Sequence, residues 1–240
     1  RKGVIVGDRV KLDGDVSGVG GSLARIVEVE GRRTWLRRSA DDMDTFERPI
    51  VANADQLMIV TALADPEPRT GMIDRILVAA YDAQVSPILC LTKADLASPD
   101  ELRTAYAPLA IPIVAIRPGS DLSPVKSLLE HHMTVLIGHS GVGKSTLVNA
   151  LVPGTGRATG AVSDVTGKGR HTSTSAAAIA LPDGGWIIDT PGVRSFGISH
   201  VRAEAFIGAF PDLEDIVTDC PRGCRHDSSA PECALDEAVR

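Results

Sequence analysis

The sequence Gly138-His139-Ser140-Gly141-Val142-Gly143-Lys144-Ser145 directly follows Met133 to Ile137, a short apolar run typical of a buried strand. Its glycines allow backbone N–H groups to turn inward around phosphate groups. Lys144 is expected to supply a positive charge to the β- and γ-phosphates, and the Ser145 hydroxyl to ligate Mg²⁺. Thr146 to Leu151 would begin a helix whose N-terminus faces the anion. Together these features predict a phosphate-binding loop at residues 138–146.

A second motif, Asp189-Thr190-Pro191-Gly192, follows another apolar strand, Trp186 to Ile188. Downstream of a phosphate loop, Asp189 is expected to hold the metal ion and the Gly192 N–H to contact the γ-phosphate. The polar, glycine-rich segment 167–174 lies between the two motifs. One of its hydroxyl groups is expected to reach Mg²⁺, and the pattern does not choose among Thr172, Ser173 and Thr174.

Upstream of the phosphate loop, Thr92-Lys93-Ala94-Asp95 follows the apolar strand Pro87 to Leu91. The Asp95 carboxylate can accept hydrogen bonds from guanine N1–H and from the exocyclic amine. Adenine offers neither, so Asp95 favours GTP over ATP. The stem of Lys93 is expected to lie along the base. Ala115, after the next apolar run, could offer its backbone N–H to the guanine carbonyl.

The order of these motifs is inverted relative to an ordinary GTPase, in which the phosphate loop comes first and the base-reading loop comes late. The inversion predicts a circularly permuted α/β domain. The apolar pattern in the rest of this region also predicts an α/β domain. It indicates a strand over 56–61, an amphipathic helix over 72–82 and a second helix over 121–130.

Three of the four cysteines cluster with a histidine as Cys220, Cys224, His226 and Cys233. Three thiolates and one imidazole would complete a tetrahedral structural zinc site without an open position for catalysis. A disulfide framework would leave one of the three cysteines over, so exposed free thiols are the remaining alternative. Cys90 lies within an apolar strand and is expected to be a core residue.

In these motifs and their order, from about residue 4 to the C-terminus, the chain resembles the RsgA/YjeQ family of circularly permuted GTPases. The matching segments are 92–95, 138–146, 169–172, 189–192 and the cysteine–histidine cluster. The resemblance implies a central P-loop GTPase domain at 51–200, with a mixed sheet and helices on both faces. It also implies a partial β-barrel OB-fold at 1–50 and a small helical zinc-binding domain at 201–240. The barrel is expected to be incomplete and the zinc domain to be truncated at its C-terminal end.

The resemblance also implies a function, namely GTP hydrolysis to GDP in late maturation of the small (30S) ribosomal subunit. Hydrolysis would be slow alone and stimulated by the subunit and its rRNA, with Mg²⁺ bound alongside the nucleotide and Zn²⁺ bound structurally. A cytoplasmic, monomeric protein is expected. The alternative is a nucleotide-gated RNA- or protein-binding module in which turnover is incidental, and a general ATPase is disfavoured by Asp95.

Catalysis needs a group that orients the attacking water, and the expected position lacks one. Val193 follows Gly192 where Ras-like enzymes place a glutamine. The valine side chain can neither donate nor accept a hydrogen bond. His171 is the favoured substitute, with Arg170 or the ribosome as alternatives.

The net charge of −6 disfavours a general RNA binder, although the charge is distributed unevenly. Residues 1–40 contain nine Lys or Arg and five Asp or Glu, a net charge of +4. No run of about 18 apolar residues indicates a membrane-spanning segment.

The positive charge of the N-terminal region is concentrated around one aromatic residue, Trp35. Its basic neighbours are Arg32, Arg33, Arg37 and Arg38. Basic side chains beside an aromatic ring suit an RNA contact of the OB type. The alternative is a solvated hairpin with the tryptophan in the barrel core.

Overall fold

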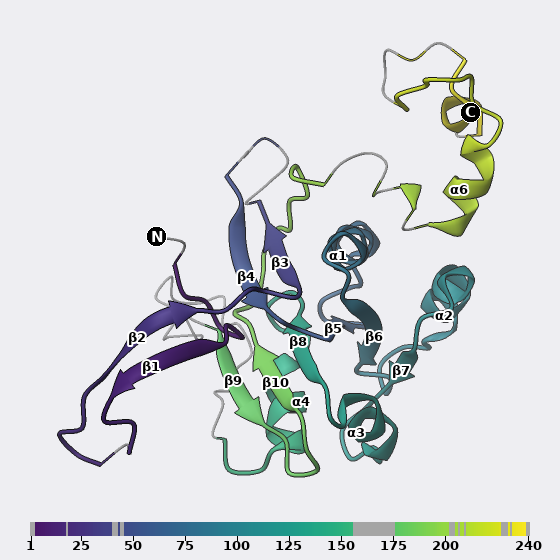
Figure 1. Cartoon of the computed structure of the whole chain (residues 1–240). Helices are drawn as coiled ribbons and strands as arrows, with labels where there is room; N and C mark the ends of the chain where they lie inside the picture. The colour runs from purple at the N-terminus through teal and green to yellow at the C-terminus, as the bar shows by residue number, and fades with distance from the viewer. Residues whose placement is uncertain are drawn as a thin grey trace.

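The computed structural model describes residues 3–17, 19–39, 43, 46–155, 176–201, 205, 207–208, 210–226, 230 and 232–238. At its centre is a six-stranded sheet with the strand order β7-β6-β5-β8-β10-β9 (Figure 1). Only β9 runs antiparallel to its neighbour in this sheet. The strands are β5 (Gln56–Ala62), β6 (Ser86–Thr92), β7 (Ile113–Ala115), β8 (Met133–Ile137), β9 (Ala177–Ala180) and β10 (Trp186–Asp189).

The strand order explains how motifs in inverted sequence order can form one site. β8 ends in the phosphate loop and lies between β5 and β10, while β6 ends in the base-reading loop and pairs with β5. Because these four strands are parallel, their carboxyl ends lie at one edge of the sheet, where open α/β sheets bind ligands. The predicted circularly permuted arrangement is therefore confirmed.

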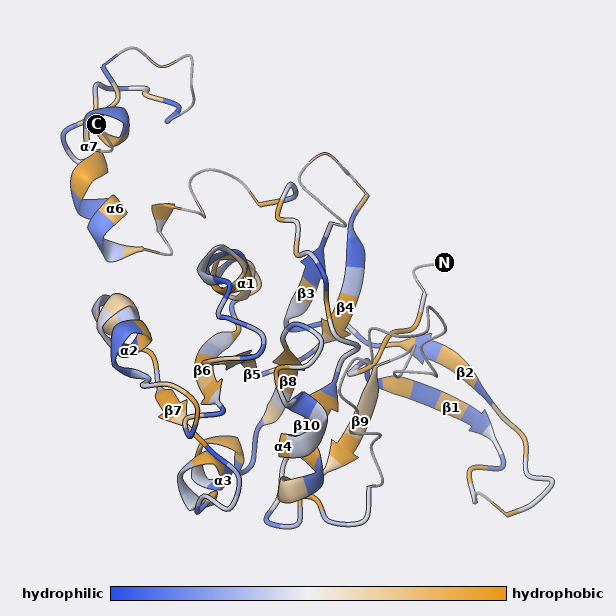
Figure 2. Ribbon diagram, turned by 180° about the vertical axis from the view of Figure 1, so that it is seen from behind, coloured by the Kyte–Doolittle hydropathy of each residue, from blue (hydrophilic) through white to orange (hydrophobic). Residues whose placement is uncertain are grey.

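Helices cover both faces of the sheet, as expected. Side chains alternate along a strand, so Leu57 and Ile59 of β5 face one core while Met58 and Val60 face the other. The first core includes buried residues of α1 (Thr70–Asp82) and α2 (Asp100–Tyr106), and the second includes those of α3 (Ser123–Leu129) and α4 (Lys144–Leu151). Figure 2 shows the apolar character of the central strands between these helices.

Three helix boundaries differ from the sequence prediction, one in α1 and two in α3. α1 begins at Thr70, before the expected start at residue 72. α3 is shorter than the expected range 121–130, because the Asp121 carboxylate accepts hydrogen bonds from the Ser123 backbone N–H and hydroxyl, 2.9 and 2.7 Å away. At the other end, Glu130 leaves the helical region with ψ of 131°. A short 3₁₀ helix, η1 (Ala107–Leu109), follows α2.

The described N-terminal strands form two separate two-stranded sheets, β1-β2 and β3-β4, rather than a closed barrel. Their bounds are β1 (Val10–Gly14), β2 (Ala24–Val29), β3 (Trp35–Arg38) and β4 (Arg48–Ala52). The β1-β2 hairpin projects from the molecule and is exposed along most of its length (Figure 1). The β3-β4 pair instead packs on the central domain, since Leu36 and Val51 belong to the same core as α1.

The β3-β4 pair also contacts the chain downstream of Asp189. Ser39 and Gly197 exchange two backbone hydrogen bonds of 3.0 and 3.2 Å. Beyond this contact, α6 (Pro211–Val217) and α7 (Ala234–Ala238) form a small C-terminal unit set apart from the central sheet (Figure 1). Among the described helices, none combines the length and apolarity needed to cross a membrane.

Candidate functional site

The phosphate loop connects β8 to α4 in the predicted strand–loop–helix context. Gly141 and Gly143 have φ of 82° and 93°, a region that side-chain-bearing residues rarely adopt. Gly138 is required for a different reason, because a Cβ there would lie 2.1 Å from the Val60 carbonyl oxygen of β5. The glycines therefore set both the turn of the loop and its close approach to the sheet.

The side chain of Lys144 lies along the phosphate loop. It is only 7% exposed, and its ammonium donates hydrogen bonds to the carbonyl oxygens of Gly138 (2.7 Å) and His139 (3.2 Å). Burial lowers the pKa of Lys144 to about 8, an effect that the nearby Asp189 carboxylate partly opposes. The lysine is thus held beside the loop that would surround the phosphates.

The Asp189–Gly192 segment docks against the phosphate loop. Asp189 is 5% exposed and pairs in register with Leu136 of β8. The Thr190 hydroxyl donates to the Leu136 carbonyl over 2.7 Å, and the Val193 N–H donates to the Gly138 carbonyl over 3.2 Å. Asp189 is therefore fixed at the carboxyl end of β10, on the sheet edge that carries Ser145.

The base-reading loop is tied to the phosphate loop by a side chain. The Thr92 hydroxyl donates to the Val142 carbonyl over 2.6 Å, so the two motifs are joined across the sheet edge. Asp95 is exposed, which leaves its carboxylate accessible to a base. Ala115 ends β7 opposite Leu91, beside this loop. The geometry thus groups the predicted base-contacting residues.

One contact of this loop was missed by the sequence prediction. The Lys93 ammonium donates to the backbone carbonyl of Asp65, in the proline-rich turn after β5. The signal in the sequence was the position of this turn after a parallel strand, which places it on the same sheet edge. This contact ties the base-reading loop to the turn after β5.

The predicted segment 167–174 lies outside the described residues, and with it His171, Thr172 and Thr174. Of the proposed magnesium ligands, Ser145 and Asp189 are described. A hydroxyl and a carboxylate are the oxygen donors that Mg²⁺ prefers, and both lie at the same sheet edge. The donor chemistry of these two residues therefore fits a nucleotide-bound Mg²⁺.

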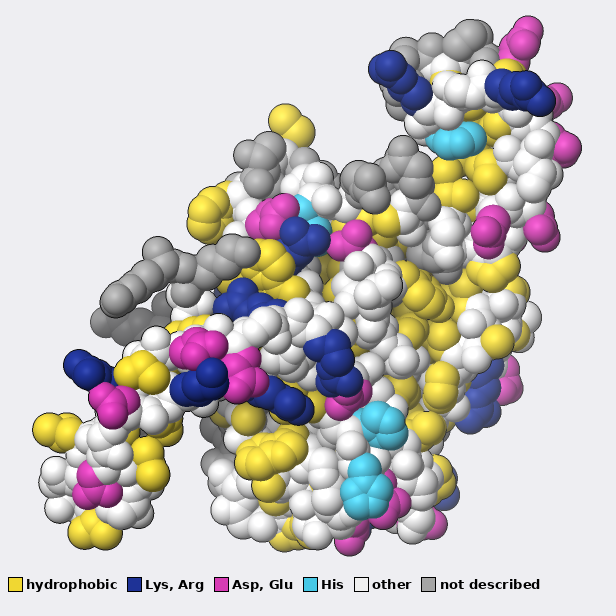
Figure 3. All heavy atoms as spheres, in the orientation of Figure 1, with side chains coloured by type: hydrophobic (Ala, Val, Ile, Leu, Met, Phe, Trp, Pro, Cys, Tyr) yellow, Lys and Arg dark blue, Asp and Glu magenta, His cyan; other side chains and the backbone are white. Residues whose placement is uncertain are grey.

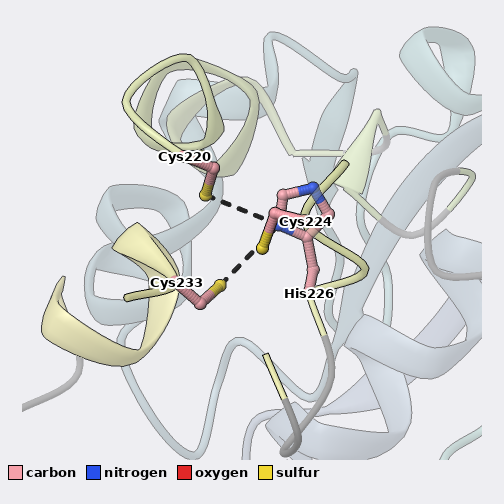
Figure 4. Close-up of side chains that lie close together, drawn as sticks. All are labelled: Cys220, Cys224, His226 and Cys233. Carbon is pink, nitrogen blue, oxygen red and sulfur yellow. Dashed lines mark hydrogen bonds between the residues drawn. The ribbon is translucent and has the colours of Figure 1, made fainter. Parts of the chain in front are cut away.

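The four predicted zinc ligands converge (Figure 4). The potential ligand atoms of Cys220, Cys224, His226 and Cys233 all lie within 4.8 Å of one another. His226 Nδ1 lies 3.6 Å from Cys220 Sγ and 3.7 Å from Cys233 Sγ. Tetrahedral zinc with ordinary Zn–S and Zn–N bonds requires an N–S separation of about 3.5 Å. The cluster therefore fits zinc.

Two further features favour thiolates in this cluster. The Ala234 backbone N–H donates to Cys220 Sγ over 3.3 Å. The contact with His226 lowers the pKa of Cys233 to about 7, whereas the pKa of Cys224 is raised. Metal binding requires deprotonated cysteines, so both features prepare the cluster for a cation.

We expect the Cys224→Ser substitution to lower zinc affinity by more than about 100-fold, because it removes a thiolate ligand. Zinc competition with a chromogenic chelator measures the effect. The Cys90→Ala variant is the control, since Cys90 is buried in β6 and should leave zinc binding unchanged. Equal zinc affinity in the Cys224→Ser and wild-type proteins would contradict the assignment.

The Gly138→Ala substitution is expected to destabilise the protein by about 1–3 kcal/mol, because the added Cβ would overlap the Val60 carbonyl. Thermal unfolding and nucleotide titration measure the loss. Gly71→Ala is the matched control: it lies in α1 with no atom within 4 Å of the added Cβ, and should be neutral or stabilising by up to about 1 kcal/mol. Equal stability of the two variants would refute the close approach.

The basic residues around Trp35 are largely paired with carboxylates. Arg32 and Arg37 stack on the ring, with Cζ 5.3 and 5.0 Å from its centroid. The three ion pairs of closest approach are Arg32–Asp8 at 2.7 Å, Arg33–Asp55 at 2.6 Å and Arg37–Glu47 at 2.8 Å. Figure 3 shows acidic and basic side chains intermixed on this face.

The arginines predicted to contact RNA therefore already have partners within the protein. The Asp8 side chain is fully buried, and its hydrogen bond with Arg32 lowers the pKa of Asp8. Arg38 donates to the Ser195 carbonyl over 3.3 Å. Arg33, Arg37 and Arg38 thus join the N-terminal region to the central domain. The contact of these arginines and of Arg32 with RNA stays a prediction.

Comparison with known proteins identifies close relatives. A sequence model described as "RsgA GTPase" matches residues 29–199. The small ribosomal subunit biogenesis GTPase RsgA of Azotobacter vinelandii is 40% identical over 98% of this chain and 69% of its own length. The protein of the same name from Pseudomonas aeruginosa is 38% identical over 98% of this chain and 70% of its own length.

Solved structures of similar fold are found as well. The crystal structure of YjeQ from Thermotoga maritima matches with a TM-score of 0.69 and 30% identity, over 99% of this chain and 78% of that one. YloQ, described as a circularly permuted GTPase, matches in fold with a TM-score of 0.65 and 24% identity, over 99% of this chain and 74% of that one.

Proposed function

The chain belongs to the RsgA family of circularly permuted GTPases, and we propose that the sheet edge described above is where it binds and hydrolyses GTP in small ribosomal subunit biogenesis. One observation carries the proposal. Three motifs in inverted sequence order meet at the carboxyl ends of β6, β8 and β10. The 2.6 Å hydrogen bond from Thr92 to Val142 joins the base-reading loop to the phosphate loop.

The residues at this edge have separable roles. The N–H groups of residues 138–146 surround the phosphates, and the Lys144 ammonium neutralises the β- and γ-phosphates. Ser145 and Asp189 would hold Mg²⁺, which would supply positive charge beside the phosphates. The Gly192 N–H meets the γ-phosphate. Asp95 and Lys93 contact the base, with Ala115 at its carbonyl edge.

Hydrolysis forms a bond from water oxygen to the γ-phosphorus, breaks the bond to the β–γ bridging oxygen and releases GDP. Val193 cannot orient this water: it is 8% exposed, belongs to the core shared with α1, and has its N–H bonded to Gly138. We therefore keep His171 as the proposed water-orienting group and Thr172 or Thr174 as the further magnesium ligand.

The test of the function is GTP turnover with and without purified small ribosomal subunits, with ATP as the control nucleotide. Turnover specific to GTP and stimulated by the subunit on the order of 10³-fold or more is expected, since external triggers of GTPases supply about 10³–10⁵. Tight GTP binding without stimulation would refute a subunit-dependent hydrolase. In the same assay His171→Ala should lose stimulation, while His132→Ala, an exposed histidine before β8, should not.

The proposal extends to organisation and partners. Residues 1–50, 51–200 and 201–240 would form the N-terminal barrel part, the GTPase domain and the zinc-binding domain, although β4 crosses the first boundary. GTP, GDP, the small subunit and its rRNA are the proposed partners. The protein would act as a monomer in the cytoplasm, where the subunit matures.

A further inference from the structure

Ser140 occupies the position in the phosphate loop that faces Gly192. A Cβ built on Gly192 would lie 3.1 Å from both the Cα and the backbone nitrogen of Ser140, and 3.4 Å from its Cβ. The Gly192 N–H is the group expected to meet the γ-phosphate. Ser140 therefore lies at the end of the loop where the γ-phosphate and the attacking water would be, beyond the residues that surround the α- and β-phosphates.

The neighbouring side chains are unsuited to contact the water. Val193 is apolar and packs in the core. His139, the other polar side chain in this turn, has Nδ1 2.8 Å from the Ser140 carbonyl oxygen. His139 also lines a small cavity of about 20 Å³ between the loop and α1, and Pro66 and Met72 line the same cavity. His139 is therefore engaged on the α1 side of the loop.

The Ser140 side chain, in contrast, is half-buried, and its hydroxyl makes no hydrogen bond with any described residue. The close contact restricts residue 192 to glycine, because a Cβ there would lie 3.1 Å from the backbone of Ser140. A small side chain with a hydroxyl is suited to accept a hydrogen bond from a water molecule without blocking its path.

We infer that the Ser140 hydroxyl is a catalytic group of the GTPase reaction, hydrogen-bonding the water that attacks the γ-phosphorus. The inference rests on the proposed function of this site. Ser140 neither gains nor loses a proton: it accepts a hydrogen bond from the water, whose proton passes to the departing phosphate. The contact compensates in part for the apolar Val193.

Three variants separate the hydroxyl from the packing role. Ser140→Ala keeps the Cβ against Gly192 and removes only the oxygen, Ser140→Gly removes both, and Ser140→Thr keeps the hydroxyl. The readouts are the single-turnover rate of GTP hydrolysis with small ribosomal subunits, the Kd for GDP and the binding of GDP with aluminium fluoride, which mimics the transition state.

The Ala and Gly variants are expected to lose about 10- to 100-fold in single-turnover rate and in affinity for the aluminium fluoride complex. Their Kd for GDP should stay within about twofold of wild type, and the Thr variant should recover part of the rate. A wild-type rate in Ser140→Ala would overturn the inference, as would a parallel loss of GDP affinity, which indicates a structural role. If the wild-type protein itself failed to hydrolyse GTP, the proposed function would fall as well.

Discussion

Replacing Asp95 by asparagine is expected to weaken GTP binding by up to about 10⁴-fold. The asparagine amide would present a donor to the exocyclic amine of guanine, so two donors would face each other and a hydrogen bond would be lost. Xanthine carries a carbonyl in place of that amine. The same variant should therefore bind xanthosine nucleotides better than guanosine nucleotides, which fluorescent GDP and XDP analogues measure directly.

The control for this substitution is Asp183→Asn. Asp183 is exposed in the turn between β9 and β10, at the opposite edge of the sheet, and the change in charge is the same. It should leave both affinities unchanged. Retention of guanosine preference by the Asp95→Asn variant would show that the base is read by other residues.

Replacing Lys144 by methionine is expected to lower kcat/KM for GTP by about 10²–10³-fold, the usual cost of removing a charge-stabilising donor. The lysine is 7% exposed and already positioned by the Gly138 and His139 carbonyls, so little reorganisation precedes its contact with phosphate. Methionine retains most of the side-chain volume, which limits the change in packing. Steady-state turnover with small subunits present gives the ratio.

Lys126→Met is the matched control, because Lys126 is an exposed residue of α3 whose nearest carboxylate is 3.9 Å away. It removes the same charge outside the site and should retain wild-type turnover. Activity of the Lys144→Met variant within tenfold of wild type would exclude the lysine from phosphate recognition. Thermal unfolding of both variants distinguishes loss of catalysis from loss of fold.

The ion pairs of the N-terminal arginines are not visible in a count of charges. Residues 1–40 have an excess of basic residues, and the structure places Arg37 2.8 Å from Glu47 and 3.3 Å from Asp82. Asp82 ends α1 and is distant in sequence. An ion pair between separate elements depends on how those elements pack, so no local pattern could have revealed it.

For the zinc cluster, the sequence predicted the ligands, but it did not predict the orientation of the histidine ring. The spacing of three cysteines and one histidine was sufficient to predict the ligands, because the metal itself constrains how far apart they can be in sequence. The spacing does not say which nitrogen of His226 turns inward, and the residue adopts φ of 53°. The structure places Nδ1 toward Cys220 and Cys233.

The sequence by itself determined the phosphate loop, the base-reading loop, their inverted order and the strands that carry them, with β8 matching the predicted Met133–Ile137. These features depend on local backbone chemistry and on runs of apolar residues, which are properties of consecutive residues. Only the tertiary structure brought Lys93 to the Asp65 carbonyl, Thr92 to Val142 and Ser140 to Gly192. Such contacts arise because the order of parallel strands in the sheet juxtaposes loops that are remote in the chain.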